Sequence, residues 1–238
     1  MTLKHKFGNV IIPALPINRR TFEIFRFELN AFITRTLSKL SPKLRKVRRE
    51  LTREKNLKVN IGSGGAGREG WINLDIRRHH KDQTIPCDIR YGLPFEDNQV
   101  RMLMAEHVVE HLDFREDVPR LLNEMNRVLE PGGHLRIVVP DGERWLRAYV
   151  SRDSDEWLAL GMPELPDDMP TPMAMINHIF HQGGEHLFAY DFETISYVLK
   201  KAGFNRVSKK AFGESEVGDL AIDLPHHASY SLYVEAAK

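Results

Sequence analysis

The chain has 238 residues, 42% of them apolar, and a formal net charge of +1. Its single cysteine, Cys87, excludes an internal disulfide and a multi-cysteine zinc site. The apolar stretch 10–17 is interrupted by two prolines and is far shorter than the roughly 20 residues that span a bilayer. It also lacks the cleavage pattern of a signal peptide, so we expect a globular protein in the cytoplasm.

Charge is distributed unevenly along the chain. Residues 1–56 hold 14 basic and 4 acidic side chains, whereas residues 57–238 hold 20 basic and 29 acidic ones. This change predicts a basic N-terminal arm over 1–56, joined to a mildly acidic domain over 57–238.

The arm has the period of an amphipathic helix. From 21 to 54, apolar residues recur mostly every three or four positions. Ser41 and Pro42 divide this segment into two predicted helices, because proline disfavours a helical conformation in the preceding residue and suits the first turn of a new helix. Seven Lys and Arg residues follow between 43 and 55. The combination over 21–55 favours a peripheral contact with the inner face of a membrane or with a partner protein, against the alternative of a solvated basic face.

From Leu57 onward the pattern changes to short β-prone runs separated by turns. Four runs predict strands: Val59–Gly62, Trp71–Ile76, Gln99–Ala105 and His134–Pro140. An amphipathic helix is predicted over Glu116–Leu129. Strand, helix and strand in this order predict a parallel α/β sheet.

The remaining chain contains an interruption and a second regular unit. Four prolines, two adjacent aspartates and several histidines predict an irregular insertion or lid over 151–188. A helix is predicted over Phe192–Ala202, with Asp191 as its N-cap. Two final strands are predicted over Asn205–Gly213 and Ser229–Ala236.

Four segments that carry glycines or polar side chains fall where predicted strands end. They are the turn Gly62-Ser63-Gly64-Gly65, Asp75, the pair Asp88-Ile89, and Glu106–Leu112. Missing side chains in the turn let a ligand approach backbone N–H groups, and a carboxylate at Asp75 can accept hydrogen bonds from two ribose hydroxyls. Ligands of open α/β sheets bind outside the carboxyl ends of the strands, so the four segments together predict a cofactor site.

These segments, together with Arg127–Gly133, resemble the class I S-adenosylmethionine-dependent methyltransferases. The resemblance covers 57–141 closely and the last helix and strands loosely. It implies a Rossmann-like sheet of about seven strands. Gly70–Asp75, Leu93–Phe95 and Ser231–Ala236 are similar to a bacterial subgroup often found with cell-surface polysaccharide genes.

The resemblance assigns each residue of the predicted site to a part of S-adenosylmethionine: Gly62, Ser63 and Gly64 to the methionine, Asp75 to the ribose, Asp88 and Ile89 to the adenine, Glu106 and His107 to the floor near the sulfonium. One feature departs from the family. Only about eight residues, 63–70, separate the first two strands, too few for a crossover helix, so a turn is expected there. A turn without a phosphate-binding helix disfavours a nicotinamide dehydrogenase.

Histidine is the side chain most readily used as a general base near neutral pH. His111 and His186 are the candidate catalytic residues, with a structural histidine bonded to backbone as the alternative for each. His178 and His181 could join His186 in a metal site, but a surface turn explains them better, so no metal is predicted.

The sequence therefore favours S-adenosylmethionine-dependent methyl transfer to a small polar acceptor, with O-methylation of a saccharide or related metabolite, and so polysaccharide biosynthesis, as the first choice. Two alternatives stay open. One is a nucleic-acid methyltransferase that uses the basic arm, and the other is a non-catalytic subunit that docks a partner complex. The acidic domain and the lack of an Asn/Asp-Pro-Pro-aromatic signature disfavour nucleic acid as the partner.

Overall fold

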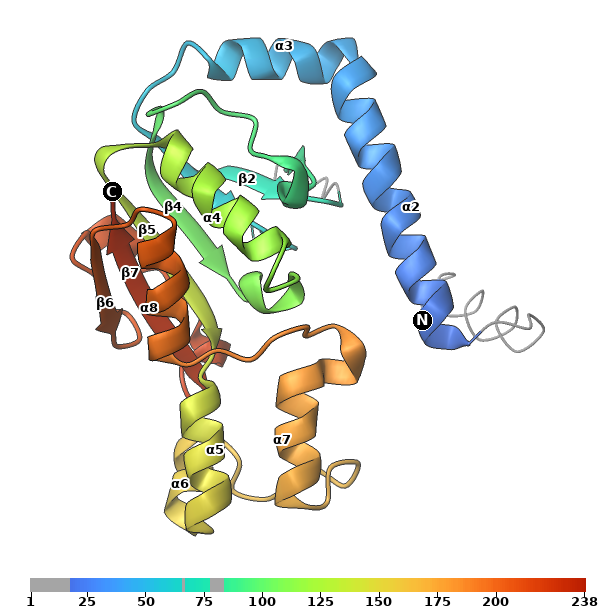
Figure 1. Ribbon diagram of the computed structural model, residues 1–238, viewed down its shortest axis with the longest axis vertical. Helices are drawn as coiled ribbons and strands as arrows, with labels where there is room; N and C mark the ends of the chain where they lie inside the picture. The colour runs from blue at the N-terminus through green and yellow to red at the C-terminus, as the bar shows by residue number, and fades with distance from the viewer. Residues whose placement is uncertain (1–17, 66, 78–83) are drawn as a thin grey trace.

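A central sheet organises the protein, whose computed structural model describes residues 18–65, 67–77 and 84–238 (Figure 1). Seven strands lie in the order β3-β2-β1-β4-β5-β7-β6. Their bounds are β1 Leu57–Ile61, β2 Ile72–Asp75, β3 Ile85–Pro86, β4 Val100–Glu106, β5 Leu129–Pro140, β6 Arg206–Lys210 and β7 Ser231–Ala237. Strands β1 to β5 pair in parallel, and β7 runs antiparallel between β5 and β6. The predicted α/β class and the Rossmann-like sheet of seven strands are confirmed.

The middle strands are apolar on both faces, which is why they lie at the centre of the sheet. In β4, Leu103 and Ala105 are buried in the main core, while Met102 and Met104 are buried in a second cluster. This alternation is the two-residue period of a strand. The two clusters therefore mark the two faces of the sheet.

Two helices cover the first face (Figure 1). Helix α4, Asp117–Val128, buries an apolar stripe that includes Leu121, Leu122 and Met125. Helix α8, Phe192–Lys201, begins at Asp191, whose Oδ1 accepts a hydrogen bond from the Thr194 N–H at 2.8 Å. The predicted helix cap is thus confirmed.

The segment 211–230, which links β6 to β7, covers part of the second face. Within it, Leu220 and Ile222 pack in the cluster that holds Met102 and Met104. The fully buried Arg136 of β5 ties the segment down, because its guanidinium pairs with Asp223 at 2.6 Å and with Glu235 of β7 at 2.8 Å. Two short helices, η5 (Gly218–Leu220) and η6 (Pro225–His227), lie in this segment. The described residues between β1 and β2 form turns, as predicted.

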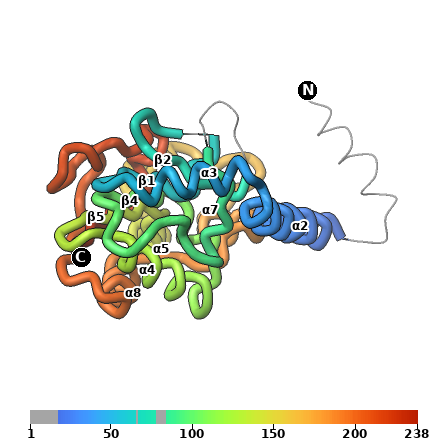
Figure 2. The backbone as a smooth tube through the Cα atoms, turned by 90° about the horizontal axis from the view of Figure 1, so that it is seen from above, coloured from blue at the N-terminus to red at the C-terminus, as the bar shows by residue number. Residues whose placement is uncertain are grey.

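The arm forms two helices, α2 (Arg19–Leu40) and α3 (Pro42–Leu51). Ser41 caps α3 by accepting a hydrogen bond from the Leu44 N–H, and Pro42 opens the first turn, so the predicted division is confirmed. Leu51 is buried in the main core, which anchors α3 to the domain. Figure 2 shows α2 extending to one side of the domain.

The segment 151–188, predicted to be an irregular insertion or lid, is partly helical. Helices α5 (Gly142–Ser151), α6 (Ser154–Ala159) and α7 (Pro172–His181) form a small unit with its own apolar cluster around Trp145. Pro172 lies in the first turn of α7, after Thr171, whose hydroxyl accepts a hydrogen bond from the Ala174 N–H. This proline starts a helix rather than interrupting one.

None of the helices within 18–65, 67–77 and 84–238 combines the length and the hydropathy needed to cross a bilayer.

Candidate functional site

The turn after β1 exposes backbone at the carboxyl edge of the sheet. Gly62 and Gly64 have φ of +66° and +52°, which L side chains rarely adopt. A side chain at Gly62 would clash with Val108, whereas no atom lies within 4 Å of the position that a Cβ would take at Gly64. Ser63 is buried, and its hydroxyl has no hydrogen-bond partner among the described residues. Open backbone beside an unpartnered hydroxyl fits the polar amino-acid end of S-adenosylmethionine.

Asp75 ends β2 directly beside this turn. Its Oδ2 accepts a hydrogen bond from the Gly64 N–H at 2.9 Å, and its Oδ1 accepts one from the Arg77 N–H at 2.8 Å. These bonds fix the carboxylate at the rim of the sheet. The structure thus brings Gly64 and Asp75 together, and their roles toward methionine and ribose stay predictions.

Asp88 is held by two arginines. Its Oδ1 accepts hydrogen bonds from the backbone N–H and Nε of Arg90, while its Oδ2 accepts them from Arg90 Nη2 at 2.9 Å and Arg35 Nη1 at 2.7 Å. Burial opposes ionisation of Asp88, but the hydrogen bonds and charge of Arg90, with help from Arg35, outweigh it and lower the pKa of the carboxyl. Four donors fill the lone pairs of one carboxylate, so an adenine amino group could bind it only by displacing a donor.

The neighbouring Ile89 begins η2 (Ile89–Tyr91) and packs against the main core. Its backbone continues the same rim of the sheet. The assignment of Ile89 to adenine stays a prediction.

Glu106, at the end of β4, is bonded to two other segments of the chain. Its Oε1 accepts hydrogen bonds from the Leu224 N–H at 3.0 Å and His227 Nδ1 at 2.9 Å, and its Oε2 pairs with Arg68 Nη2 at 2.8 Å. Burial raises the pKa of Glu106, but these partners outweigh it and lower the pKa overall. The carboxylate therefore fastens the segment 211–230 and the turn after β1 to the floor of the predicted site.

His107 follows with a φ of +52°, an uncommon conformation for a residue with a side chain. Its Nε2 lies 2.9 Å from the Ser231 hydroxyl, and its Nδ1 lies 3.0 Å from Glu110 Oε1. Its ring centroid is 3.8 Å from that of His227. His107 thus links the floor of the predicted cofactor site to Glu110.

The two predicted catalytic histidines lie side by side, although 75 positions separate them in the sequence. The ring centroids of His111, in η3 (Val109–His111), and His186 are 4.9 Å apart. The Leu187 N–H donates to the Glu110 carbonyl oxygen at 2.7 Å and so docks the segment that carries His186. Burial lowers the pKa of His186, which favours its neutral form.

Glu110 completes this group; it lies within the predicted segment Glu106–Leu112 but is not one of the predicted site residues. One ligating atom from each of Glu110, His111 and His186 lies within 4.8 Å of the others. His178 and His181 are not members of the group. The spacing His-x-x-Glu-His over 107–111 indicates this group in the sequence, because a tight turn places the three side chains close together.

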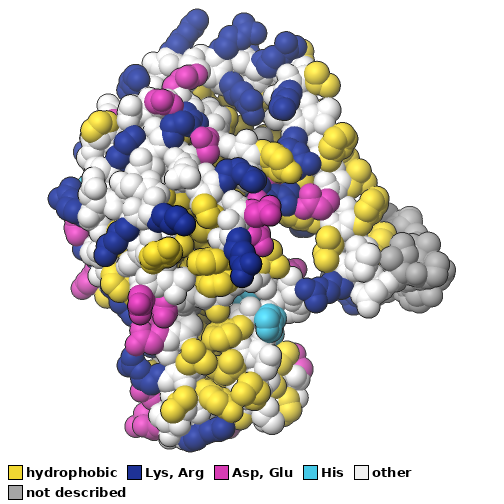
Figure 3. Space-filling model, in the orientation of Figure 1, with side chains coloured by type: hydrophobic (Ala, Val, Ile, Leu, Met, Phe, Trp, Pro, Cys, Tyr) yellow, Lys and Arg dark blue, Asp and Glu magenta, His cyan; other side chains and the backbone are white. Residues whose placement is uncertain are grey.

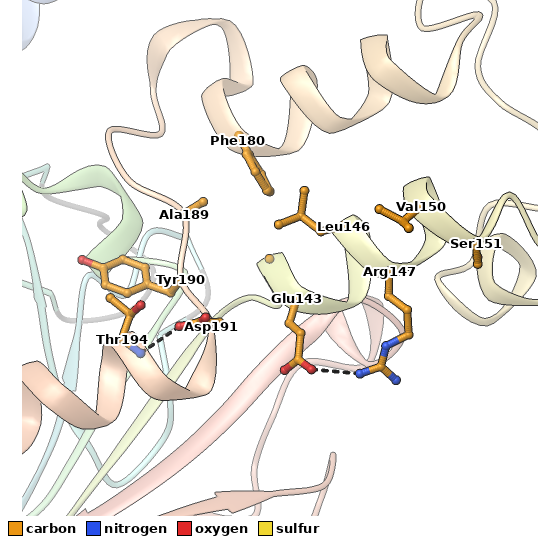
Figure 4. Close-up of a pocket in the computed structure, with 11 residues that line it drawn as sticks. Glu143, Leu146, Arg147, Val150, Ser151, Phe180, Ala189, Tyr190, Asp191 and Thr194 are labelled. Carbon is orange, nitrogen blue, oxygen red and sulfur yellow. Dashed lines mark hydrogen bonds and ion pairs between the residues drawn. The ribbon is translucent and has the colours of Figure 1, made fainter.

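A separate cavity of about 600 Å³ lies between α5, α7 and the start of α8 (Figure 4). Phe180 and Leu146 point toward one another across it, while Glu143 pairs with Arg147 at its edge. The predicted cofactor and catalytic residues do not line this cavity. It is therefore distinct from the candidate site.

Comparison with known proteins finds a match to the methyltransferase domain family over residues 69–137. The chain is also 32% identical, over 80 residues, to the probable tRNA methyltransferase 9B of Mus musculus, an alignment that covers 34% of this chain and 18% of that protein. The chain thus spans less than a fifth of the length of this curated relative.

Two solved structures are similar to the chain over most of its length. A SAM-dependent methyltransferase from Archaeoglobus fulgidus is 16% identical, with a TM-score of 0.48 and coverage of 91% of this chain and 99% of that chain. A possible histamine N-methyltransferase from Thermotoga maritima is 16% identical, with a TM-score of 0.46 and coverage of 92% and 97%.

The family match covers the segment that holds Asp75, Asp88 and Glu106. The sheet order around this segment is the one described above. Residues 69–137 therefore match the methyltransferase domain family, in agreement with the predicted class of enzyme and its predicted cofactor, S-adenosylmethionine.

Proposed function

We propose that the protein transfers a methyl group to a hydroxyl oxygen of a small polar acceptor, with a saccharide or related metabolite as the first choice. The observation that carries this proposal is the histidine group beside the floor of the predicted cofactor site, within a methyltransferase domain. When bound, S-adenosylmethionine supplies an electrophilic methyl carbon. The residues of the chain then have two tasks, which are to hold the cofactor and to align the acceptor.

The cofactor side rests on the carboxyl edge of β1, β2 and β4. The open turn at Gly62 to Gly64 and the carboxylate of Asp75 form one continuous rim. Glu106 and His107 follow at the next strand, where the floor beneath the sulfonium is expected. A rim of backbone N–H groups and carboxylates suits a ligand that carries an amino acid and a ribose.

The acceptor side rests on His111 and His186. His111 is partly exposed, so it can contact an entering molecule, and His186 is buried with a lowered pKa. A neutral imidazole can accept the proton that a hydroxyl loses during methyl transfer. The likeness of Gly70–Asp75 and Ser231–Ala236 to a subgroup found with polysaccharide genes supports a saccharide as the acceptor.

The test is an acceptor screen with S-adenosylmethionine that carries a labelled methyl group. Nucleotide sugars, free sugars and tRNA are offered in parallel, and Asp75→Ala serves as the variant deficient in cofactor binding. Label transferred to a sugar hydroxyl by the native chain, and lost in the variant, supports the proposal. Transfer only to nitrogen or only to tRNA contradicts it.

A nucleic-acid acceptor is the second candidate, because the mouse relative is described as a tRNA methyltransferase and the arm of this chain is basic. Phosphate contacts by Lys and Arg make binding steeply dependent on salt. If tRNA is the substrate, its affinity for the protein should fall by orders of magnitude between 50 and 200 mM salt. Replacing the basic side chains of α3 with neutral ones should weaken the binding of every RNA sequence to the same extent.

We also infer that residues 21–55 contact an anionic membrane surface at its inner face. The face of α2 that meets the domain is polar, because Thr34 and Arg35 bond to Ile76 and Asp88. The opposite face exposes an apolar stripe, and basic side chains of α3 are exposed beside it (Figure 3). An outward apolar stripe next to clustered cations is the pattern of a helix that lies on a membrane.

A further inference from the structure

Glu110 is a buried carboxylate whose surroundings do not account for its charge. Its side chain is 1% exposed. Neither carboxylate oxygen accepts a hydrogen bond from the described residues, although His107 Nδ1 lies 3.0 Å from Oε1. A buried carboxylate without hydrogen bonds is costly unless a cation compensates it. The position therefore suits a positively charged partner, and among the described residues His107 provides one only when it is protonated.

The two histidines beside Glu110 have one ring nitrogen each already bonded to backbone. His186 Nδ1 lies 2.6 Å from the Ile179 carbonyl oxygen, and His111 Nδ1 lies 3.0 Å from the Glu185 carbonyl oxygen. A carbonyl oxygen only accepts, so in each ring Nδ1 carries the hydrogen and Nε2 keeps a lone pair in the neutral form. Histidines that bind metals commonly donate their other N–H to a carbonyl in this way, which fixes the ring.

This arrangement differs from a carboxylate–histidine pair that acts as a base. In such a pair the carboxylate accepts the Nδ1–H of the histidine and orients it. Here the Nδ1 atoms of His111 and His186 donate to backbone carbonyls instead, and Glu110 accepts from neither ring. The three side chains thus present a carboxylate and two imidazole lone pairs to one another without a hydrogen bond between them.

We propose that Glu110, His111 and His186 bind one divalent transition-metal ion, with Zn²⁺ as the representative member of the class. Two imidazoles and one carboxylate are a ligand set that such ions take, with further positions open to water or substrate. Donors about 2.1 Å from a common tetrahedral ion lie about 3.4 Å from one another. One possible ligand atom from each residue already lies within 4.8 Å of those of the other two, so closure requires each separation to shorten by about 1.4 Å at most.

The surroundings of the three residues suit a catalytic rather than a closed structural site. His107 lies against Glu110 from the inner side and is itself 2.9 Å from the Ser231 hydroxyl, which orders the carboxylate. His111, by contrast, is partly exposed. An ion held here would therefore be reachable from solvent, next to the floor of the predicted cofactor site.

The role of the ion rests on the proposed function and changes one part of it. The lone pairs of His111 and His186 would bind the ion, so neither ring would accept the proton of the acceptor. An acceptor hydroxyl bound to the ion would have a lowered pKa and would lose its proton to bulk water. The resulting oxygen would form a bond to the methyl carbon while the carbon–sulfur bond breaks and its electron pair stays on sulfur. The acceptor is then an alcohol or a phenol whose hydroxyl oxygen can bind the metal ion.

The test measures metal binding without cofactor or acceptor. Untagged chain is stripped with a chelator, dialysed, and titrated with Co²⁺, whose visible absorption reports imidazole and carboxylate coordination, and with Zn²⁺ in competition. One Co²⁺ per chain, displaced by Zn²⁺, is expected. A folded chain that binds neither ion stoichiometrically overturns the proposal.

Variants locate the site. Glu110→Gln and His111→Asn should each weaken Co²⁺ binding by about 100-fold or more, since loss of a ligand exceeds the 10- to 100-fold effect typical of residues that orient ligands. His111 is partly exposed whereas Glu110 is buried, so the His111 variant should fold even if Glu110→Gln does not. The matched control His178→Asn, on α7 outside the group, should bind Co²⁺ normally. Unchanged binding in His111→Asn, or loss confined to His178→Asn, contradicts the assignment.

The result is separable from that of the proposed function. Stoichiometric Co²⁺ binding with no methyl transfer to any hydroxyl would leave the metal site standing and refute the reaction. Methyl transfer to a hydroxyl that survives complete removal of metal would support the reaction and refute the role of the ion. Transfer abolished by the chelator and restored by Zn²⁺ or Co²⁺ supports both.

Discussion

Arg35 of the N-terminal arm reaches Asp88 at the carboxyl edge of the sheet, with Nη1 2.7 Å from Oδ2. The two residues are 53 positions apart, and the Asp88 side chain is 2% exposed. Arg90 completes the group and also pairs with Glu28 of α2 at 2.6 Å. The arm is therefore fastened to the place where the adenine is predicted to bind, so an adenine amino group could reach the Asp88 carboxylate only by displacing Arg35 or Arg90.

Replacing Asp88 tests this group. Asp88→Asn should lower the free energy of unfolding at neutral pH by about 2 kcal/mol, because Arg35 and Arg90 lose a charged acceptor. The pKa of Asp88 is lowered in the folded protein, so its stabilisation is present above the unfolded pKa of about 3.9 and is lost as the pH falls through the folded pKa. Urea denaturation at several pH values should show the difference from the native chain shrinking below about pH 4.

The control for this experiment is Asp97→Asn. Asp97 pairs with Arg127, but its side chain is 71% exposed, so the change should stay within about 0.5 kcal/mol. A difference between the native chain and Asp88→Asn that persists unchanged at pH 2 would show that the ion pair is not its cause.

The cofactor rim gives a second prediction. S-adenosylmethionine at 100 times its dissociation constant should add about 2.7 kcal/mol of apparent stability if it binds only the native chain. Asp75→Ala should remove a large part of this gain, whereas Asp219→Ala, which changes an exposed carboxylate, should keep it. Thermal melting with the cofactor and with its demethylated product measures the effect. A well-folded sample that shows no shift with either ligand would refute the assignment of this rim.

Loss of His186 gives a third prediction. His186→Asn should reduce turnover by about 10²- to 10⁴-fold and leave the affinity for the cofactor nearly unchanged, since the histidine acts toward the acceptor. His111→Asn should behave alike, and His178→Asn should not. Initial rates and calorimetry of cofactor binding separate the two effects. If both variants keep full turnover, the prediction is wrong, and catalysis depends only on aligning the acceptor with the methyl group of the cofactor.

The outward stripe of α2 gives a fourth prediction. Phe25 and Phe32 are 65% and 58% exposed, so changing both to Ser should leave the fold intact while weakening co-sedimentation with anionic vesicles. The double variant Lys46→Glu, Arg49→Glu should weaken vesicle binding further, by about 1 kcal/mol for each basic side chain lost. Added salt should also weaken the binding of the native chain to anionic vesicles.

Tyr197→Ser is the matched control for the vesicle experiment, because it removes an equally exposed aromatic ring from α8, outside the arm. Its binding should equal that of the native chain. If the native chain ignores anionic vesicles at low salt, the membrane proposal is refuted and the stripe belongs to a protein contact.

The buried cation of β5 gives a fifth prediction. Arg136→Met should lower the free energy of unfolding by about 3–5 kcal/mol, because it leaves the buried carboxylates of Asp223 and Glu235 without a cation. Guanidinium denaturation measures this. The exposed Arg147, which pairs with Glu143, is the control, and its replacement by Met should change stability by less than about 1 kcal/mol. Equal effects at the two positions would contradict the argument.

Local signals in the sequence predicted the local structure well. Ser41 with Pro42, and Asp191, each act on the backbone within a few residues, so the helix boundaries they mark could be found without a structure. Helix α7 is hard to read from the sequence because prolines dominate the pattern over 163–172, and a proline in a first turn looks the same in sequence as one that breaks a helix.

The contacts that build the candidate site are mostly distant in sequence. The order of Gly62, Asp75 and Glu106 is readable from the sequence because each lies at the carboxyl end of a strand. The bond from Arg35 to Asp88, and the approach of His186 to Glu110, depend on how separate elements pack, and no local pattern encodes them. Glu110 was passed over because a glutamate in a turn is usually exposed, and only its burial makes it unusual.

The antiparallel strand β7 lies between β5 and β6, so synthesis of the chain on a ribosome leaves β5 with an unpaired edge until residues 231–237 have emerged. Until then Met102 and Met104 also lack the segment 211–230 that covers them. A nascent chain with an open edge and an uncovered apolar face is prone to associate with other chains. Slow translation over 140–230 should therefore raise the fraction of insoluble protein more than the same delay placed before residue 57.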